Sequence, residues 1–104
     1  MNPRLEGYAA AVLEVADGEA ASRLAADLAA IDRLFAGNEA LRAAMSDTAV
    51  AGASRRAVLD ELLEGKVADG ARRAAAFAAG AVPATEVPGA MTWLAHRARR
   101  AAEG

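Results

Sequence analysis

The stretch YAAAVLEVA, from Tyr8 to Ala16, decides how we interpret the fold of this chain. At about 100° per residue, the apolar side chains in and around it cover roughly 200° of a helix, with Glu6, Glu14 and Asp17 on the remaining arc. A helix that only seals a core needs about half of that arc. The excess predicts either a second contact inside the domain or a surface for a partner, and the helical angles leave both open.

The composition is that of a folded, helical protein. The chain has 104 residues, of which 55% are hydrophobic and 25% charged, and alanine supplies much of the apolar share. A chain of this length fits one domain with a simple core. Alanine favours helix, while aromatic residues and runs of β-branched residues, which favour strands, are scarce. We therefore expect an all-α protein.

Cap and stop signals divide the chain into segments. Glycines 18, 37, 65 and 80 mark expected helix ends, and Asn38, Ser54 and Thr85 are expected caps. The sequence thus predicts a single-domain six-helix bundle over residues 1–104, with helices over 3–17, 19–36, 39–45, 54–64, 71–79 and 86–102. The apolar side chains expected to face inward in the second and fourth helices are Leu24, Leu28, Ile31, Phe35, Val58, Leu59, Leu62 and Leu63.

Charge and cysteine content argue against several classes of protein. A net charge of −2 gives no basic footprint for nucleic acid, and the absence of cysteine removes disulfides and thiolate chemistry. The longest apolar run, over 74–84, is far shorter than the roughly 20 residues that span a bilayer. Glu6 and Glu14 interrupt any secretory signal. We expect a cytoplasmic protein that neither binds nucleic acid nor inserts into the membrane.

No group of residues predicts catalysis. His96, the single histidine, lies among arginines on an expected helix, where a polar surface role is favoured over that of a base. Gly65-Lys66 ends a helix and lacks the upstream glycine of a phosphate-binding loop. The basic run from His96 to Arg100 complements the negative end of its own helix. Trp93 is expected in the core or at its edge. We predict no catalytic residue, no cofactor and no metal ligand.

Several stretches resemble the N-terminal domain of the delta subunit of F-type ATP synthase, the family of the oligomycin sensitivity-conferring protein. YAAAVLEVA resembles the opening Tyr-Ala-x-Ala-Leu helix of that family. NEALRAAMSDTAV over 38–50 is similar to its Asn-x-x-Leu segment and loop, and RRAVLDELLEGKVAD over 55–69 to its Leu-Leu-x-Gly-Lys-Val stretch. The use of arginine over lysine resembles actinobacterial members. The likeness covers most of the chain.

Two departures accompany the resemblance. The family usually has Gly-Arg-Leu after the fifth helix, where this chain has Gly80, Ala81 and Val82, followed by Pro83. Family members also continue into a second domain that meets the b subunit of the stalk, and the chain stops at Gly104. We expect either an isolated domain or a diverged stand-alone version, with the b subunit contacted only through a missing or separate domain.

The resemblance implies a non-catalytic stator adaptor that resists rotor torque, at the cytoplasmic face of the cell membrane in a peripheral complex. The first and fifth helices of the family form a groove for the N-terminal helix of the alpha subunit on the F1 head. In the first helix, Val12, Leu13 and Ala16 are then expected to face the bundle. The residues expected to line the groove are Tyr8, Ala11, Val12, Val15, Ala71, Ala74, Ala75, Phe77 and Ala78.

Rival interpretations belong to other classes. A small helical regulator that binds another protein or nucleic acid is the main alternative, and a phosphate-driven complex of that kind is expected to weaken steeply with salt. An enzyme is a distant third, because the sequence offers no nucleophile with a base.

Overall fold

The computed structural model describes residues 2–104 and is helical throughout, with no strand among those residues. It therefore confirms the all-α prediction. A short 3-10 helix, η1, precedes the last of the six α-helices. The elements are α1 (Pro3–Val12), α2 (Gly18–Ala36), α3 (Glu39–Met45), α4 (Gly52–Leu63), α5 (Asp69–Ala81), η1 (Ala84–Glu86) and α6 (Val87–Glu103).

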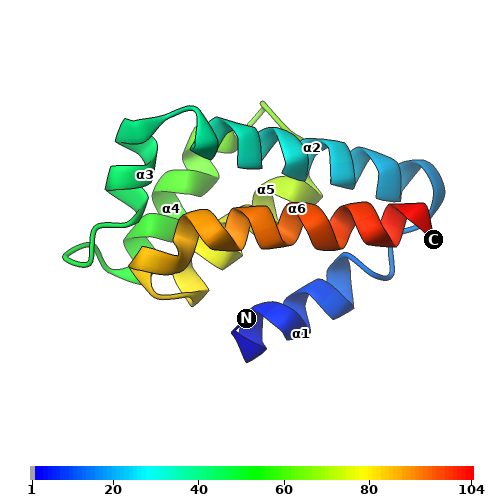
Figure 1. Ribbon diagram of the computed structural model, residues 1–104, viewed down its shortest axis with the longest axis horizontal. Helices are drawn as coiled ribbons and strands as arrows, with labels where there is room; N and C mark the ends of the chain where they lie inside the picture. Colours follow the sequence, from blue (N-terminus) through cyan, green and yellow to red (C-terminus); the bar gives the residue numbers. More distant parts are fainter. Residues whose placement is uncertain (1) are drawn as a thin grey trace.

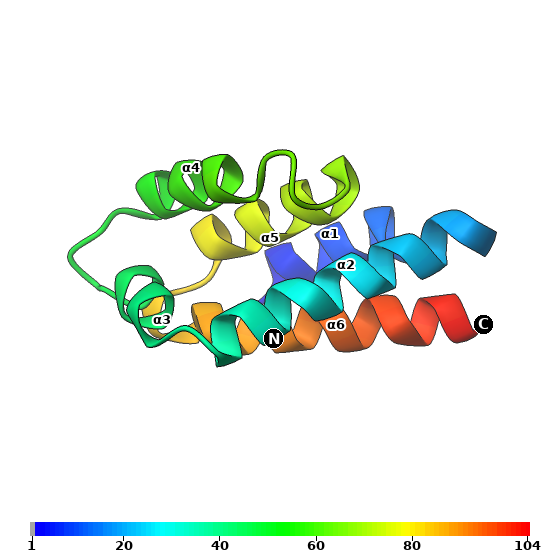
Figure 2. The ribbon, with the colours of Figure 1, turned by 90° about the horizontal axis from the view of Figure 1, so that it is seen from above.

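The helices form two layers. α2 and α6 lie antiparallel and side by side, and α4 and α5 form an antiparallel hairpin that covers one side of this pair (Figures 1 and 2). α3 closes the end at which α2 stops. α1 lies at one edge of the bundle and packs on α5 (Figure 1). The molecule measures 39 × 27 × 19 Å along its principal axes.

The core follows the predicted pattern of α2. Leu24, Leu28, Ile31 and Phe35 are all buried, at spacings of four, three and four residues on one helical face. They join a single apolar cluster with the inner faces of α5 and α6, and Trp93 lies partly buried at its edge. α3 has its predicted bounds, and the side chain of Asn38 accepts a hydrogen bond from the Leu41 amide at 2.9 Å, which confirms the cap.

The first helix is shorter than predicted. α1 begins at Pro3, with the Asn2 side chain accepting hydrogen bonds from the first-turn amides, but it ends at Val12 instead of near Asp17. The Glu14 amide donates to the Ala9 carbonyl, five residues back, which opens the helix into a turn over 13–15. As a result, Val15 leaves the helical face on which it was predicted and is 72% exposed.

The inner stripe of α1 also differs from the predicted one. Leu5, Ala9 and Leu13, four residues apart, are fully buried. Leu13 was predicted to face the bundle and does so, whereas Val12 and Ala16 are only partly buried. The neighbouring stripe of α1, which includes Tyr8 and Val12, is therefore only partly buried.

The prediction for α4 was wrong in its start and in half of its inner face: Leu59 and Leu63 are buried as predicted, whereas Val58 and Leu62 are not. The helix begins at Gly52 after Ala51, so Ser54 is not its cap. Arg55, Leu59 and Leu63 occupy the inward stripe, and Val58 and Leu62, each about 100° away from a stripe member, are 53% and 36% exposed. Arg55 therefore belongs to the inward stripe, where hydropathy alone predicted only aliphatic side chains.

α5 does not end at Gly80 as predicted but continues to Ala81. Gly80 serves close packing instead: a Cβ atom built there would lie 3.0 Å from the Gly52 carbonyl oxygen of α4. After α5, Thr85 lies within η1 and does not cap α6, which begins at Val87 with Pro88 in its first turn.

Within the part of the chain that the structure describes, no helix combines the length and the hydropathy needed to cross a membrane.

Candidate functional site: the α1 and α5 surface

Tyr8 of α1 and Phe77 of α5 form the centre of the site. Their rings are stacked, with centroids 4.5 Å apart and planes 14° from parallel. Both side chains are partly buried and lie at the margin of the core cluster. Both aromatic residues that were predicted to line the groove are thus brought together by the packing of α1 on α5.

Arginines from three helices act on this aromatic pair, two through the Phe77 ring and one through its charge near Tyr8. The guanidinium carbons of Arg4 and Arg56 lie 5.7 and 5.6 Å from the centroid of the Phe77 ring, within cation–π range. Arg73, one turn before Phe77 on α5, is exposed and acts electrostatically on Tyr8. We call Tyr8, Phe77, Arg4, Arg56 and Arg73 the aromatic–arginine cluster.

The pKa of the Tyr8 hydroxyl reflects both burial and the neighbouring positive charges. Burial raises the pKa of Tyr8 above its ordinary value of 10.0, while the positive charges of Arg56 and Arg73 act in the opposite direction. Tyr8 is therefore neutral at physiological pH and presents a hydroxyl that can donate as well as accept a hydrogen bond.

Two open depressions border α1 and α5, toward opposite ends of α5. One, of about 220 Å³, is lined by Arg4, Arg56 and Phe77 together with backbone near Gly52 and Gly80. The other, of about 300 Å³, is lined mainly by apolar groups, with Arg23 as its charged member. Its apolar lining residues are Val12, Ala16, Ala20, Leu24, Ala68 and Gly70.

The remaining predicted groove residues fall into two groups. Ala11 is exposed on α1, Val12 lines the apolar depression, and Val15 is exposed in the turn that follows α1. The four alanines of α5 that were predicted to face a partner are fully buried, because α1, α4 and α6 already cover that side of the helix. We therefore leave these four out of the proposed contact surface: Ala71, Ala74, Ala75 and Ala78.

The sequence did not identify the three arginines as part of the site. Arg4 is one turn before Tyr8 and Arg73 one turn before Phe77, so helical spacing alone places each beside its aromatic neighbour. Arg56 comes from α4, and only the antiparallel pairing of α4 with α5 brings it to Phe77.

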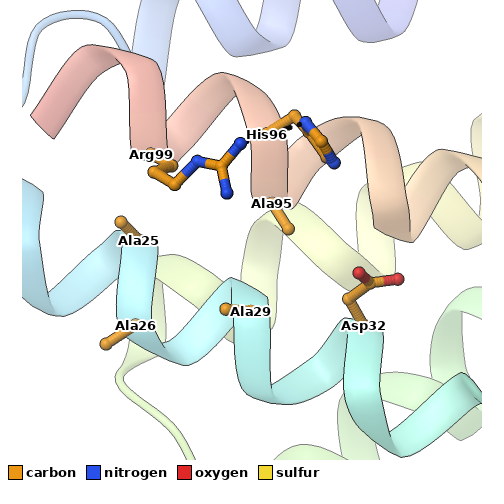
Figure 3. A pocket seen from close by; sticks show the side chains of 7 residues that line it. All are labelled: Ala25, Ala26, Ala29, Asp32, Ala95, His96 and Arg99. Atoms are coloured by element: carbon orange, nitrogen blue, oxygen red, sulfur yellow. Dashed lines mark hydrogen bonds between the residues drawn. The ribbon is translucent and has the colours of Figure 1, made fainter. Parts of the chain in front are cut away.

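A third depression, of about 300 Å³, lies between α2 and α6 (Figure 3). Ala25, Ala26 and Ala29 line its α2 side and Ala95 its α6 side, with Asp32, His96 and Arg99 around them. His96 is exposed, and its Nδ1 atom lies 3.5 Å from Arg99 Nη2. Among residues 2–104 no group of three or more acidic or histidine side chains is placed to hold a metal ion.

The fold and the site together define an all-helical domain with an aromatic pair on two neighbouring helices and arginines from three helices beside it. The family model described as ATP synthase delta (OSCP) subunit matches residues 6–79, more than half of the chain and the whole span from Tyr8 to Phe77. The chain therefore belongs to the ATP synthase delta (OSCP) subunit family. The match ends directly before Gly80. Comparisons with curated proteins and with solved structures found no match.

Proposed function

We propose that this protein is a non-catalytic adaptor of the ATP synthase peripheral stalk that binds the N-terminal helix of the alpha subunit across α1 and α5. The observation that carries the proposal is the Tyr8–Phe77 stack, which places two partly exposed aromatic rings on adjacent helices of a domain in this family. Aromatic side chains at the centre of an interface supply a large share of binding energy.

The shape of the surface suits an amphipathic helix. An apolar depression lies beside Val12, between the end of α1 and the first turns of α2 and α5, and small residues such as Ala68 and Gly70 allow a partner backbone to approach closely. A helix that lies in such a groove presents side chains at spacings of three and four residues. The exposed Ala11 next to Val12 extends the same surface on α1.

The physical role of such a contact is to stay bound under load. In the proposed complex the domain holds the catalytic head against rotor torque, at the cytoplasmic face of the cell membrane. Apolar burial favours slow dissociation, whereas charges at the rim mainly change the association rate. Contact with the b subunit is assigned to a separate domain.

A synthetic peptide of the N-terminal segment of the cognate alpha subunit tests the proposal. Isothermal titration calorimetry should show saturable binding, and circular dichroism of the mixture should show more helix than the sum of the separate spectra. A peptide with the same composition in scrambled order, which has no apolar stripe, serves as the control. Absence of binding by the native peptide would contradict the proposed function.

A further inference from the structure

The arginines of the aromatic–arginine cluster have no carboxylate partner among residues 2–104. Arg4, Arg56 and Arg73 form no ion pair with any residue in the described part of the chain. They approach one small area from α1, α4 and α5 respectively. Like charges so close together repel one another, which raises the free energy of an uncompensated cluster. Arginines without an ion pair also occur elsewhere in the described residues, as at Arg23 and Arg33, and the cluster differs from them in bringing three such arginines to one aromatic pair.

The remaining arginines include some with clear partners. Arg72, also on α5, pairs with Asp60 at 2.9 Å, and Arg97 pairs with Glu14. Arg55 is buried and donates to three backbone carbonyls. The chain has 14 acidic residues against 12 basic ones, so carboxylates are not scarce. The cluster is a positive area on a protein of net negative charge.

The two arginines over Phe77 are also pre-positioned. Their guanidinium groups lie at nearly equal distances from the ring centroid, 5.7 Å for Arg4 and 5.6 Å for Arg56. A cation–π contact of this kind restricts the side chain while leaving the N–H donors available for an anion. Less side-chain entropy is then lost when an anion binds.

We propose that the aromatic–arginine cluster binds a carboxylate side chain of the docked partner helix, so that the helix carries an acidic residue beside its apolar stripe. This inference rests on the proposed function, since it names the chemistry of the same partner. Arginine binds a carboxylate through paired N–H donors with defined geometry. The acidic residue fixes the register of the helix, because only one position along it meets the cluster.

A protein carboxylate fits the cluster better than a nucleic acid does. The three arginines lie beside one aromatic pair, and the depression between α1, α2 and the start of α5 is lined mainly by apolar groups. A nucleic-acid surface would need a longer basic track along the phosphates. The acidic side chains elsewhere on the chain would also repel a polyanion.

The test uses the cognate alpha-subunit peptide and three arginine variants, Arg4→Gln, Arg56→Gln and Arg73→Gln, each measured by calorimetry. Arg33→Gln, which changes an exposed arginine on α2, is the matched control. We expect Arg56→Gln to weaken binding roughly tenfold, which corresponds to about 1.4 kcal/mol. The control should leave the affinity unchanged, and Arg56→Lys should keep part of it. Thermal melts establish that each variant is folded.

A double-mutant cycle then locates the carboxylate. Each acidic residue of the peptide is changed to its amide, and one such change should have little additional effect on binding to Arg56→Gln, because the interaction is already lost. If the peptide binds all three arginine variants as tightly as it binds Arg33→Gln, the carboxylate assignment is overturned while the proposed function stands. No binding to the unmodified protein overturns both. Displacement of the peptide by duplex DNA at moderate salt would also overturn the assignment.

Discussion

The ring of Tyr8 stacks on the ring of Phe77, and this contact joins the middle of α1 to the C-terminal half of α5. At the start of α1, the Asn2 side chain donates to the Ala81 carbonyl at the end of α5, at 3.3 Å, which fixes the antiparallel register of α1 and α5. The turn after α1 is held by the ion pair of Glu14 with Arg97 on α6. The aromatic pair is thus both a packing contact and the centre of the exposed surface.

Truncation of one ring should therefore affect binding more than folding. We expect Tyr8→Ala to weaken binding of the alpha-subunit peptide by about 2 kcal/mol or more, as for an interface hot spot. The free energy of unfolding should fall by only about 1 kcal/mol, since the side chain is partly exposed and loses one aromatic contact. Calorimetry and urea denaturation measure the two effects. Tyr8→Phe is the control that keeps the stack. Equal losses of binding and unfolding free energy in Tyr8→Ala would show that the role of Tyr8 is purely structural.

The ionisation of Tyr8 can be followed directly, because it is the only tyrosine of the chain. Its folded-state pKa lies above 10.0, so the folded protein holds the phenolic proton more tightly than the unfolded chain does. The resulting contribution to stability is complete below pH 10.0 and is lost as the pH rises through the folded-state pKa. An ultraviolet absorbance titration should give a midpoint above 10.0, and Arg56→Gln should raise it further. A midpoint that does not respond to Arg56→Gln would contradict the electrostatic contact.

The crossing of α4 and α5 depends on two glycines. A Cβ atom added to Gly52 would lie 2.6 Å from the Gly80 carbonyl oxygen, so Gly52→Ala forces the helices apart. We expect it to lower the free energy of unfolding by about 1–3 kcal/mol, in the range of overpacked sites. Gly7→Ala, where no atom lies within 4 Å of the added Cβ, should stabilise α1 by up to about 1 kcal/mol. If Gly52→Ala and Gly7→Ala change the free energy of unfolding in the same direction, the close approach of α4 and α5 is not the cause of the Gly52→Ala effect.

Arg55 holds the end of α5 to the start of α4. Its guanidinium group donates to the carbonyls of Ala79, Val50 and Val82 at 2.9, 2.6 and 3.0 Å. Arg55→Met removes all three donors and leaves buried carbonyls unsatisfied, at a cost of about 2–4 kcal/mol. Thermal unfolding followed by the fluorescence of Trp93 measures the loss. Arg33→Met, at an exposed position, should unfold like the unmodified protein, and an equally small effect of Arg55→Met would refute the role given to its donors.

Hydropathy and stop signals were enough to predict the helices that bury a regular stripe. α2 and α3 follow their predicted bounds within a residue, because Leu24, Leu28, Ile31 and Phe35 repeat at helical spacing and Asn38 provides a cap. The errors lie where tertiary contacts override local preference. In the sequence Gly80 signals a helix end, yet α5 continues to Ala81. The glycine at this position instead allows α5 to approach Gly52 of α4 closely.

The candidate site was only partly predictable for the same reason. Tyr8 and Phe77 were identified because large aromatic side chains on over-apolar helices are conspicuous in the sequence. The alanines of α5 could not be divided into buried and exposed from one helix alone, since their burial depends on which neighbours cover them. Arg56 reaches Phe77 through the pairing of two helices, and no local pattern in the sequence encodes that contact.

The central claim is that the alpha-subunit helix binds on α1 and α5, and chemical-shift mapping by NMR tests it most directly. Addition of the unlabelled alpha-subunit peptide to the isotopically labelled protein should shift amide signals around Tyr8, Ala11 and Phe77. The alanine-lined depression between α2 and α6, represented by Ala29 and Ala95, should remain unchanged. Shifts confined to Ala29, Ala95 and their neighbours, with Tyr8 and Phe77 unaffected, would contradict the account.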